Sequence, residues 1–272
     1  PQPDLSNWDR VAAIKTNPPK SVRIGLVGKY THYEDAYKSL VEAISHGGFA
    51  HEAEVKLELI DSETIENQND AKAKLANVDG VLVPGGFGIR GCEGMIQAIQ
   101  YARENKVPFL GICLGMQMAS IEVSRNVLGI ENAGSTEWQT QVTPIVGYMS
   151  EWETEEGKAS RALSGDLGGT MRLGAYACAL SEGSLAKKVY RDEEEIFERH
   201  RHRYEINMGY KEQWAERGIE LSGQSPDGRL PEIMEVTDHP WFIGVQFHPE
   251  LKSRPLDPHP LFAAFIGASM AA

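Results

Sequence analysis

Short apolar runs alternate with stretches of helical periodicity through the first half of the chain, and this alternation restricts the fold more than any other feature. Strands are predicted at residues 22–27, 55–59, 78–83 and 107–112. Between them, apolar residues recur every three or four positions, which predicts helices at residues 36–46, 95–102 and 114–127. Strands that alternate with helices favour a mostly parallel sheet with helices on both faces. We therefore expect residues 21–272 to form one α/β domain.

The rest of the chain is less regular and predicts additions to this sheet. A short helix over residues 5–14 precedes a linker that ends at Pro18 and Pro19. The helix that follows the first strand is expected to stop at Gly47 and Gly48. In the second half we predict strands or hairpins at 141–147 and 170–180, an acidic helix at 193–198, a closing strand at 241–247 and a final helix at 260–269.

Composition excludes several classes of protein. The net charge is −12, which opposes binding to the phosphate backbone of nucleic acids. The sequence contains no apolar run long enough for a membrane helix and no apolar signal segment near its start. Its three cysteines are widely spaced and lack the spacing of a zinc site, which predicts no metal and favours a reducing compartment, the cytoplasm.

The string Gly-Ile-Cys-Leu-Gly at residues 111–115 lies where a buried strand meets a helix. This spacing is typical of a nucleophile elbow, a sharp turn that leaves no room for side chains two positions before and after the nucleophile. A helix N-terminus also favours the thiolate form of Cys113. The alternative is a buried structural cysteine. Cys92 and Cys178 lack this context, and Cys178 is expected in the core.

The string Phe-His-Pro-Glu at residues 247–250 directly follows the last predicted strand. His248 and Glu250 can point to one place because Pro249 restricts the backbone between them. Glu250 would then orient the imidazole toward Cys113, as in a cysteine–histidine–carboxylate triad. The alternative is a surface turn. The other seven histidines have no comparable context and are interpreted as surface or core polar residues.

A glycine-rich string, Pro-Gly-Gly-Phe-Gly at residues 84–88, follows the strand at 78–83. Its backbone N–H near Gly86, together with that of Leu114, could stabilise a tetrahedral oxyanion, each donor being worth about 3 kcal/mol. The alternatives are a plain turn or a phosphate loop. Residues 86–91 also match the G-x-G-x-x-G pattern of dinucleotide sites, although no P-loop string is present.

Taken in order, the strings at 84–86, 111–117 and 247–250 resemble the class I (triad) glutamine amidotransferases, whose fold is flavodoxin-like. The strings at 27–30, 35–37, 85–91, 168–174 and 201–205 resemble the glutaminase domain of the CTP synthase family in particular. This resemblance implies a catalytic triad of Cys113, His248 and Glu250.

The resemblance also implies a glutamine site. Its contacts are expected at Gly86, Phe87, Leu114, Gly115, Met116, Gln117, Glu137 and Arg203. Glu137 can pair with the α-amino group of glutamine, and the guanidinium of Arg203 with its α-carboxylate. The alternatives are a solvated acid at Glu137 and a charged surface, or a nucleic-acid patch, at residues 199–203. The neighbouring acids at 193–198 oppose a nucleic-acid patch.

In that family the cysteine attacks the side-chain amide of glutamine and ammonia is released. The ammonia passes to UTP, which is activated by ATP, and CTP is formed. The resemblance therefore implies an N-terminal amidoligase domain that holds ATP, magnesium and UTP, with residues 1–20 as its tail and linker. It also implies activation by GTP and a homotetramer for the full-length enzyme only. Two alternatives stay open: another γ-glutamyl hydrolase or amidotransferase subunit, or a weakly active binding module. The strings at 27–37 and 168–174 oppose the first.

Overall fold

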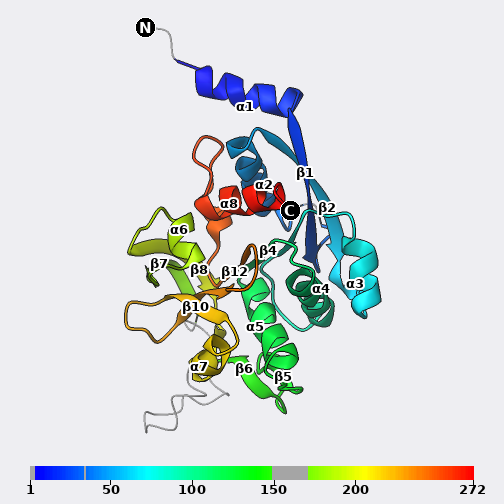
Figure 1. Ribbon diagram of the computed structural model, residues 1–272, viewed down its shortest axis with the longest axis vertical. Helices are drawn as coiled ribbons and strands as arrows, with labels where there is room; N and C mark the ends of the chain where they lie inside the picture. Colours follow the sequence, from blue (N-terminus) through cyan, green and yellow to red (C-terminus); the bar gives the residue numbers. More distant parts are fainter. Residues whose placement is uncertain (1–3, 34, 149–170) are drawn as a thin grey trace.

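A computed structural model of the chain describes residues 4–33, 35–148 and 171–272. Its centre is a nine-stranded sheet (Figure 1). Across the sheet the strands are β2 (Ala53–Asp61), β1 (Lys20–Gly28), β3 (Gly80–Val83), β4 (Phe109–Ile112), β12 (Phe242–Val245), β11 (Pro231–Val236), β10 (Ile219–Gln224), β7 (Arg172–Leu180) and β8 (Glu195–His202). The strands from β2 to β12 are parallel, and those from β11 to β8 are antiparallel. The predicted α/β fold with extra strands in the second half is confirmed.

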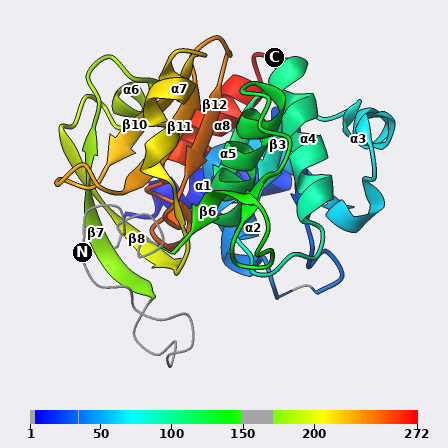
Figure 2. The ribbon, with the colours of Figure 1, turned by 90° about the horizontal axis from the view of Figure 1, so that it is seen from below.

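Helices cover both faces of the sheet and enclose two separate cores. On one face, α2 (Lys38–Ala50) and α8 (Pro260–Ser269) lie side by side (Figure 1). On the other, α4 (Cys92–Glu104) packs between α5 (Leu114–Asn126) and α3 (Gln68–Leu75) (Figure 2). The predicted arrangement of helices is therefore confirmed. Within the described residues, no helix has both the length and the apolar character needed to cross a bilayer.

Smaller elements complete the structure. A second sheet consists of β5 (Ala133–Ser135), β6 (Thr143–Gly147) and β9 (Glu205–Ile206). The short helices are α6 (Leu185–Val189), α7 (Lys211–Ala215), η1 (Ser62–Thr64), η4 (Met208–Tyr210) and η5 (Pro249–Leu251). The first helix, α1 (Ser6–Thr16), lies at one end of the molecule, and Ile14 is its only buried residue (Figure 1).

The central strands carry almost only apolar residues because both of their faces are covered. All residues of β3, β4 and β12 are buried. The edge strand β2 is instead half-exposed, as its alternating sequence predicts. The last strand in sequence, β12, does not lie at an edge, because it is inserted between β4 and β11. This insertion brings two distant parts of the chain to the same end of the sheet.

The predicted acidic helix at residues 193–198 is wrong, because this segment begins the edge strand β8 (Glu195–His202). Burial alternates along β8 with a period of two, which a strand allows and a helix does not. Three of its inward residues are polar, namely Glu198, His200 and His202. Polar residues at these buried positions hid the alternation from a search for apolar periodicity.

The predicted end of α2 at Gly47 and Gly48 is also wrong, since the helix continues to Ala50 and begins only at Lys38. The two glycines allow close packing instead of ending the helix. A β-carbon at Gly47 would lie 2.7 Å from the carbonyl oxygen of Phe262, and one at Gly48 would lie 2.6 Å from that of Ala53. Glycine is therefore required by the approach of α8 and β2, and not by a helix cap.

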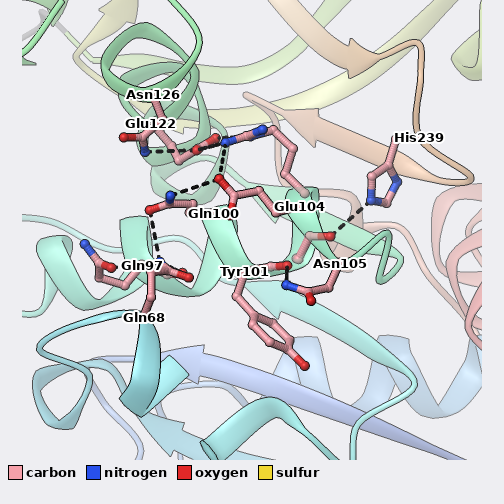
Figure 3. Close-up of polar contacts among 11 residues, drawn as sticks. Gln68, Gln97, Gln100, Tyr101, Glu104, Asn105, Glu122, Asn126 and His239 are labelled. Atoms are coloured by element: carbon pink, nitrogen blue, oxygen red, sulfur yellow. Dashed lines mark hydrogen bonds and ion pairs between the residues drawn. The ribbon is translucent and has the colours of Figure 1, made fainter. Parts of the chain in front are cut away.

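Polar contacts tie α3, α4 and α5 together (Figure 3). The Nε atom of Arg103 on α4 donates to both carboxylate oxygens of Glu122 on α5, at 3.1 and 2.9 Å. Glu122 is fully buried and also accepts from Asn126 at 3.1 Å. The ion pair therefore fixes the C-terminal part of α5 to α4. This helps to hold the turn before α5 in place.

Candidate active site

Cys113 lies at the end of β4, immediately before α5, in a strained turn. Its backbone has φ 52° and ψ −100°, a region that residues other than glycine rarely adopt. Its N–H donates to the carbonyl of Val245 on β12 at 2.7 Å. A β-carbon at Gly111 would lie 2.8 Å from the backbone of Gly115, and one at Gly115 would clash with the carbonyl oxygen of Val83. The predicted elbow and the need for both glycines are confirmed.

The N-terminus of α5 adjoins the Cys113 side chain. The first N–H groups of a helix have no acceptor within it and carry the positive end of its dipole. The first hydrogen bond of this turn runs from the N–H of Gln117 to the carbonyl of Cys113, at 3.1 Å. This end of α5, with its unpaired N–H groups, therefore starts directly after Cys113.

His248 follows β12, the strand next to β4 in the sheet. Its backbone N–H donates to the carbonyl of Arg199 on β8 at 2.8 Å. Its Nδ1 donates to Oε1 of Glu250 at 2.7 Å, and both side chains are more than four-fifths buried. Glu250 reaches the imidazole because residues 249–251 form the short helix η5. The arrangement of His248 and Glu250 predicted from the sequence is thus present.

The proton affinity of His248 reflects these neighbours. Burial by itself lowers the pKa of His248, but its interactions with the Cys113 sulfur and the Glu250 carboxylate outweigh burial and raise this pKa to about 10. The Nε2 atom, on the other side of the ring, is buried and makes no hydrogen bond of ordinary geometry with the described residues. A hydrogen bond between a nucleophile and its base is often poorly aligned before a substrate binds.

The glycine-rich loop after β3 lies against both Cys113 and His248. A β-carbon at Gly85 would lie 2.9 Å from Cε1 of His248 and 3.5 Å from the β-carbon of Cys113. One at Gly86 would lie 3.2 Å from the Leu114 side chain. The backbone of the loop therefore lies directly beside the Cys113 and His248 side chains and the start of α5. This is the arrangement that an oxyanion site between the loop and Leu114 requires.

A pocket of about 430 Å³ opens over these groups. The sequence-predicted residues in its wall are Gly86, Phe87, Cys113, His248 and Glu250. Residues that the sequence reasoning did not assign to the site also line it, among them Tyr30, Tyr37 and Arg201. These three belong to the strings at 27–30, 35–37 and 201–205, so a signal for them was present in the sequence.

Other predicted substrate contacts lie outside the pocket wall. Leu114, Gly115, Met116 and Gln117 are buried. Gln117 donates to the carbonyl of Tyr204 at 3.0 Å and to Gln246 at 3.1 Å. Glu137 accepts a hydrogen bond from the N–H of Gly88 at 2.8 Å, which joins it to the glycine-rich loop. Arg203 is partly buried. The roles of these residues in binding stay predictions, and residues 168–170 lie outside the described residues.

A buried polar cluster near His248 was missed by the sequence reasoning. Arg172 donates to Glu232 at 2.7 Å and to Glu205 at 3.2 Å, and His202 donates to Glu205 at 2.8 Å. Burial raises the pKa of Glu232 to about 7 although Arg172 opposes this. Burial, together with the charge of Arg172, lowers the pKa of His200 to about 2. The alternation of arginine and histidine along residues 199–202 was the available signal for a strand here.

Cys92 and Cys178 are both buried and belong to different surroundings from Cys113. Burial raises the pKa of Cys92 to about 11 and raises that of Cys178 further. The expected core position of Cys178 is confirmed. Neither thiol therefore has the ionisation that a nucleophile needs. In the described part of the chain, no group of three or more potential ligands is placed to hold a metal ion.

Comparison with known proteins adds to this geometry. The family described as glutamine amidotransferase class-I matches residues 32–268. A CTP synthase of Nitrobacter hamburgensis is 57% identical over 270 residues, which are 99% of this chain and 50% of the relative. A CTP synthase of Rhodopseudomonas palustris is also 57% identical, over 98% of this chain and 49% of its own length. The chain thus spans about half the length of these curated relatives.

A solved structure supports the same relationship. The Trypanosoma brucei CTPS glutaminase domain with bound acivicin superposes with a TM-score of 0.81 at 36% sequence identity. The match covers 92% of this chain and 94% of that domain. The family match over most of the chain and the agreement with a domain of nearly the same extent lead to one conclusion. The chain belongs to the class I glutamine amidotransferase family, as a glutaminase domain of the CTP synthase type.

Proposed function

We propose that this chain hydrolyses glutamine to glutamate and ammonia, with Cys113 as nucleophile, His248 as general base and acid, and Glu250 as its orienting carboxylate. One observation carries the proposal. The strained elbow at Cys113 and the His248–Glu250 pair, 2.7 Å apart, follow neighbouring parallel strands and meet at one pocket. This is the arrangement that covalent catalysis by a cysteine requires.

The proposed chemistry begins with the proton of Cys113 passing to His248. The raised pKa of His248 keeps this proton on the imidazole near neutral pH. The sulfur attacks the side-chain amide carbon of glutamine, and the oxyanion accepts hydrogen bonds from backbone N–H groups near Gly86 and from Leu114. The C–N bond then breaks as His248 protonates the leaving ammonia.

A γ-glutamyl thioester on Cys113 remains after ammonia departs. Water, deprotonated by His248, attacks the thioester carbon, and glutamate leaves as the sulfur regains its starting state. In the substrate complex we assign the α-amino group of glutamine to Glu137 and its α-carboxylate to Arg203. Leu114, Gly115, Met116 and Gln117 would contribute through backbone atoms at the start of α5, because their side chains are buried.

Glutamate release from glutamine tests this proposal. The chain should release glutamate, and Cys113→Ala should reduce the rate by at least about 1,000-fold, since a nucleophile has no substitute. Cys178→Ala, a matched change at another buried cysteine, should retain activity. Acivicin should block turnover and add one adduct at Cys113, read by peptide mass spectrometry. Release that persists in Cys113→Ala would refute the mechanism.

The same experiment addresses the open alternative of a weakly active module. Labelling of Cys113 by acivicin without turnover would show a formed site that needs a further domain. We extend the proposal to the whole protein on the strength of its relatives: residues 1–20 form a tail and linker, and residues 21–272 the glutaminase domain. A preceding amidoligase domain would use the ammonia to convert UTP to CTP with ATP and magnesium, in a tetramer activated by GTP. Turnover measured with and without that domain and these nucleotides tests the extension.

A further inference from the structure

Lys29, the residue after β1, is almost fully buried beside the glycine-rich loop. Its ammonium group is 3.0 Å from the carbonyl oxygen of Phe87, 2.5 Å from that of Gly88 and 3.8 Å from the sulfur of Cys92. An ammonium has three protons to donate, and these three partners account for all of them. Burial of a lysine charge is costly unless it is paired in this way.

The two carbonyls reach one ammonium because of the backbone at Gly88. Gly88 has φ 76°, a left-handed conformation that suits glycine, and a β-carbon there would meet no atom within 4 Å. Glycine is thus needed for its conformation and not for lack of space. With this turn, successive carbonyls of Phe87 and Gly88 both point to Lys29. The Cys92 thiol also donates to the Gly88 carbonyl, at 3.3 Å.

Glu137 holds the opposite side of the same peptide group. In a trans peptide the C=O and the next N–H point in opposite directions. The Phe87 carbonyl accepts from Lys29, and the Gly88 N–H donates to Oε1 of Glu137 at 2.8 Å. The peptide plane between Phe87 and Gly88 is therefore held between a cation and a carboxylate. Hydrogen bonds to charged groups are about twice as strong as those between neutral groups.

This peptide group lies one residue after Gly86, where the proposed oxyanion donor lies. The stem of Lys29 also passes beneath Gly86, since a β-carbon on Gly86 would lie 3.3 Å from Cε of the lysine. Rotation of the Phe87–Gly88 peptide would change the direction of the N–H groups before it, because adjacent peptide planes share backbone dihedrals. Oxyanion stabilisation depends on donors that are already aimed at the site.

We propose that Lys29, with Glu137 opposite it, is a positioning residue for the glutaminase reaction, which fixes the glycine-rich loop so that its N–H groups face the oxyanion. The inference rests on the proposed function and adds a residue that does not itself line the pocket but supports Phe87 in its wall from behind. It also gives Glu137 a second task beside recognition of the α-amino group. Loss of the ammonium should slow the chemical step while leaving the Cys113–His248 pair intact.

The test compares Lys29→Met, Lys29→Arg and the control Lys56→Met, a change at an exposed lysine on the neighbouring strand β2. Four quantities are measured: kcat and KM for glutamine, the rate of Cys113 alkylation by iodoacetamide, and the thermal midpoint. In Lys29→Met we expect kcat to fall about 10- to 100-fold, less than the about 100- to 1,000-fold loss when an oxyanion donor is removed outright. The KM and the alkylation rate should change less than about threefold, because ground-state binding of glutamine and the Cys113–His248 pair are retained. Lys29→Arg should recover part of the lost kcat.

Glu137→Gln tests the contact on the other side of the Phe87–Gly88 peptide. It also keeps the proposal testable if Lys29→Met does not fold. It is assayed on glutamine and on 4-carbamoylbutanoate, which is glutamine without its α-amino group. A fall in kcat on both substrates supports the positioning role, whereas a change confined to glutamine means that Glu137 only binds the α-amino group and overturns the role.

Three further outcomes separate this inference from the proposed function. Cys113-dependent glutamate release by the parent chain, with an unchanged kcat in Lys29→Met, overturns the role of Lys29 alone. The same conclusion follows if kcat, alkylation and thermal midpoint all fall together and Lys29→Arg restores none of them, because that pattern means a purely structural lysine. Absence of Cys113-dependent release from the parent chain overturns the proposed function and this role with it.

Discussion

Replacement of Glu250 by glutamine removes one charge from the site with little change in shape. The carboxylate accepts a hydrogen bond from Nδ1 of His248 at 2.7 Å in a largely buried setting. A glutamine side chain can still accept this hydrogen bond through its amide oxygen. The substitution therefore isolates the contribution of the charge from that of the contact.

The magnitude follows from the kind of hydrogen bond that is lost. A hydrogen bond to a charged group contributes about 1.5–3 kcal/mol and a neutral one about 1 kcal/mol. The difference of about 1–2 kcal/mol corresponds to about one pKa unit, at 1.36 kcal/mol per unit. Since the pKa of His248 is raised to about 10 partly by Glu250, we expect Glu250→Gln to lower that pKa by about one unit.

The sign of the effect on stability follows from linkage. The pKa of His248 is higher in the folded chain than the 6.5 of an unperturbed histidine. Its protonation therefore stabilises the fold fully below about pH 6.5, and this contribution is lost as the pH rises through about 10. Glu250→Gln should lower the free energy of unfolding by about 1–2 kcal/mol at pH 6 and have no such effect above pH 10.

Two assays measure this prediction. Denaturant unfolding at several pH values gives the difference in stability, with Glu131→Gln, at an exposed residue, as a matched control. The pH profile of kcat should show its alkaline limb displaced to lower pH by about one unit, because the imidazolium is the proton donor to ammonia. A stability loss that is independent of pH, or an alkaline limb that stays in place, would refute the assignment of the charge pair.

Two further predictions concern the packing that supports the site. Gly47→Ala should lower the free energy of unfolding by about 1–3 kcal/mol, because the added β-carbon would lie 2.7 Å from the carbonyl oxygen of Phe262; denaturant unfolding measures it. Glu122→Ala should lower the free energy of unfolding by about 3 kcal/mol, the lower end for breaking a buried ion pair, because the guanidinium of Arg103 keeps only the half-exposed Glu104 as a partner. The shift in thermal midpoint reports this loss, and the fully buried position of Glu122 makes solvent screening negligible.

Each of these has a simple contrary outcome. If Gly47→Ala stabilises the chain by the usual gain in helix propensity, α8 does not approach α2 as closely as described. If Glu122→Ala costs no more than Glu131→Ala, the ion pair between α4 and α5 contributes nothing measurable.

Much of the fold was predictable because its parallel half obeys local rules. The strands from β1 to β4 and the helices between them carry apolar residues at the period of their own structure. The same holds for the elbow, because the glycines around Cys113 are dictated by contacts within a few residues and the neighbouring strand. The pairing of His248 with Glu250 was predictable for the same reason: only one proline separates them.

The failures came where long-range packing decided the outcome. Residues 195–202 contain charged and polar side chains at inward positions, so their strand character becomes clear only when Arg172 and Glu232 are in place opposite them. Gly47 and Gly48 are typical of a helix end in sequence, yet the backbones of α8 and β2 approach them. Lys29 lies in the string at 27–30, but nothing in its sequence neighbourhood shows that its ammonium reaches Phe87 and Gly88.

The insertion of β12 between β4 and β11 has a consequence for the order in which the chain is synthesised. Cys113 leaves the ribosome long before His248, but the strand that carries His248 is also the strand that completes the middle of the sheet. A nascent chain that ends before residue 242 therefore lacks both His248 and the central strand. Formation of such non-local strand pairs is slow, because a long loop must close first. On the proposed mechanism, a chain that ends before His248 therefore cannot hydrolyse glutamine, although its nucleophile is already present.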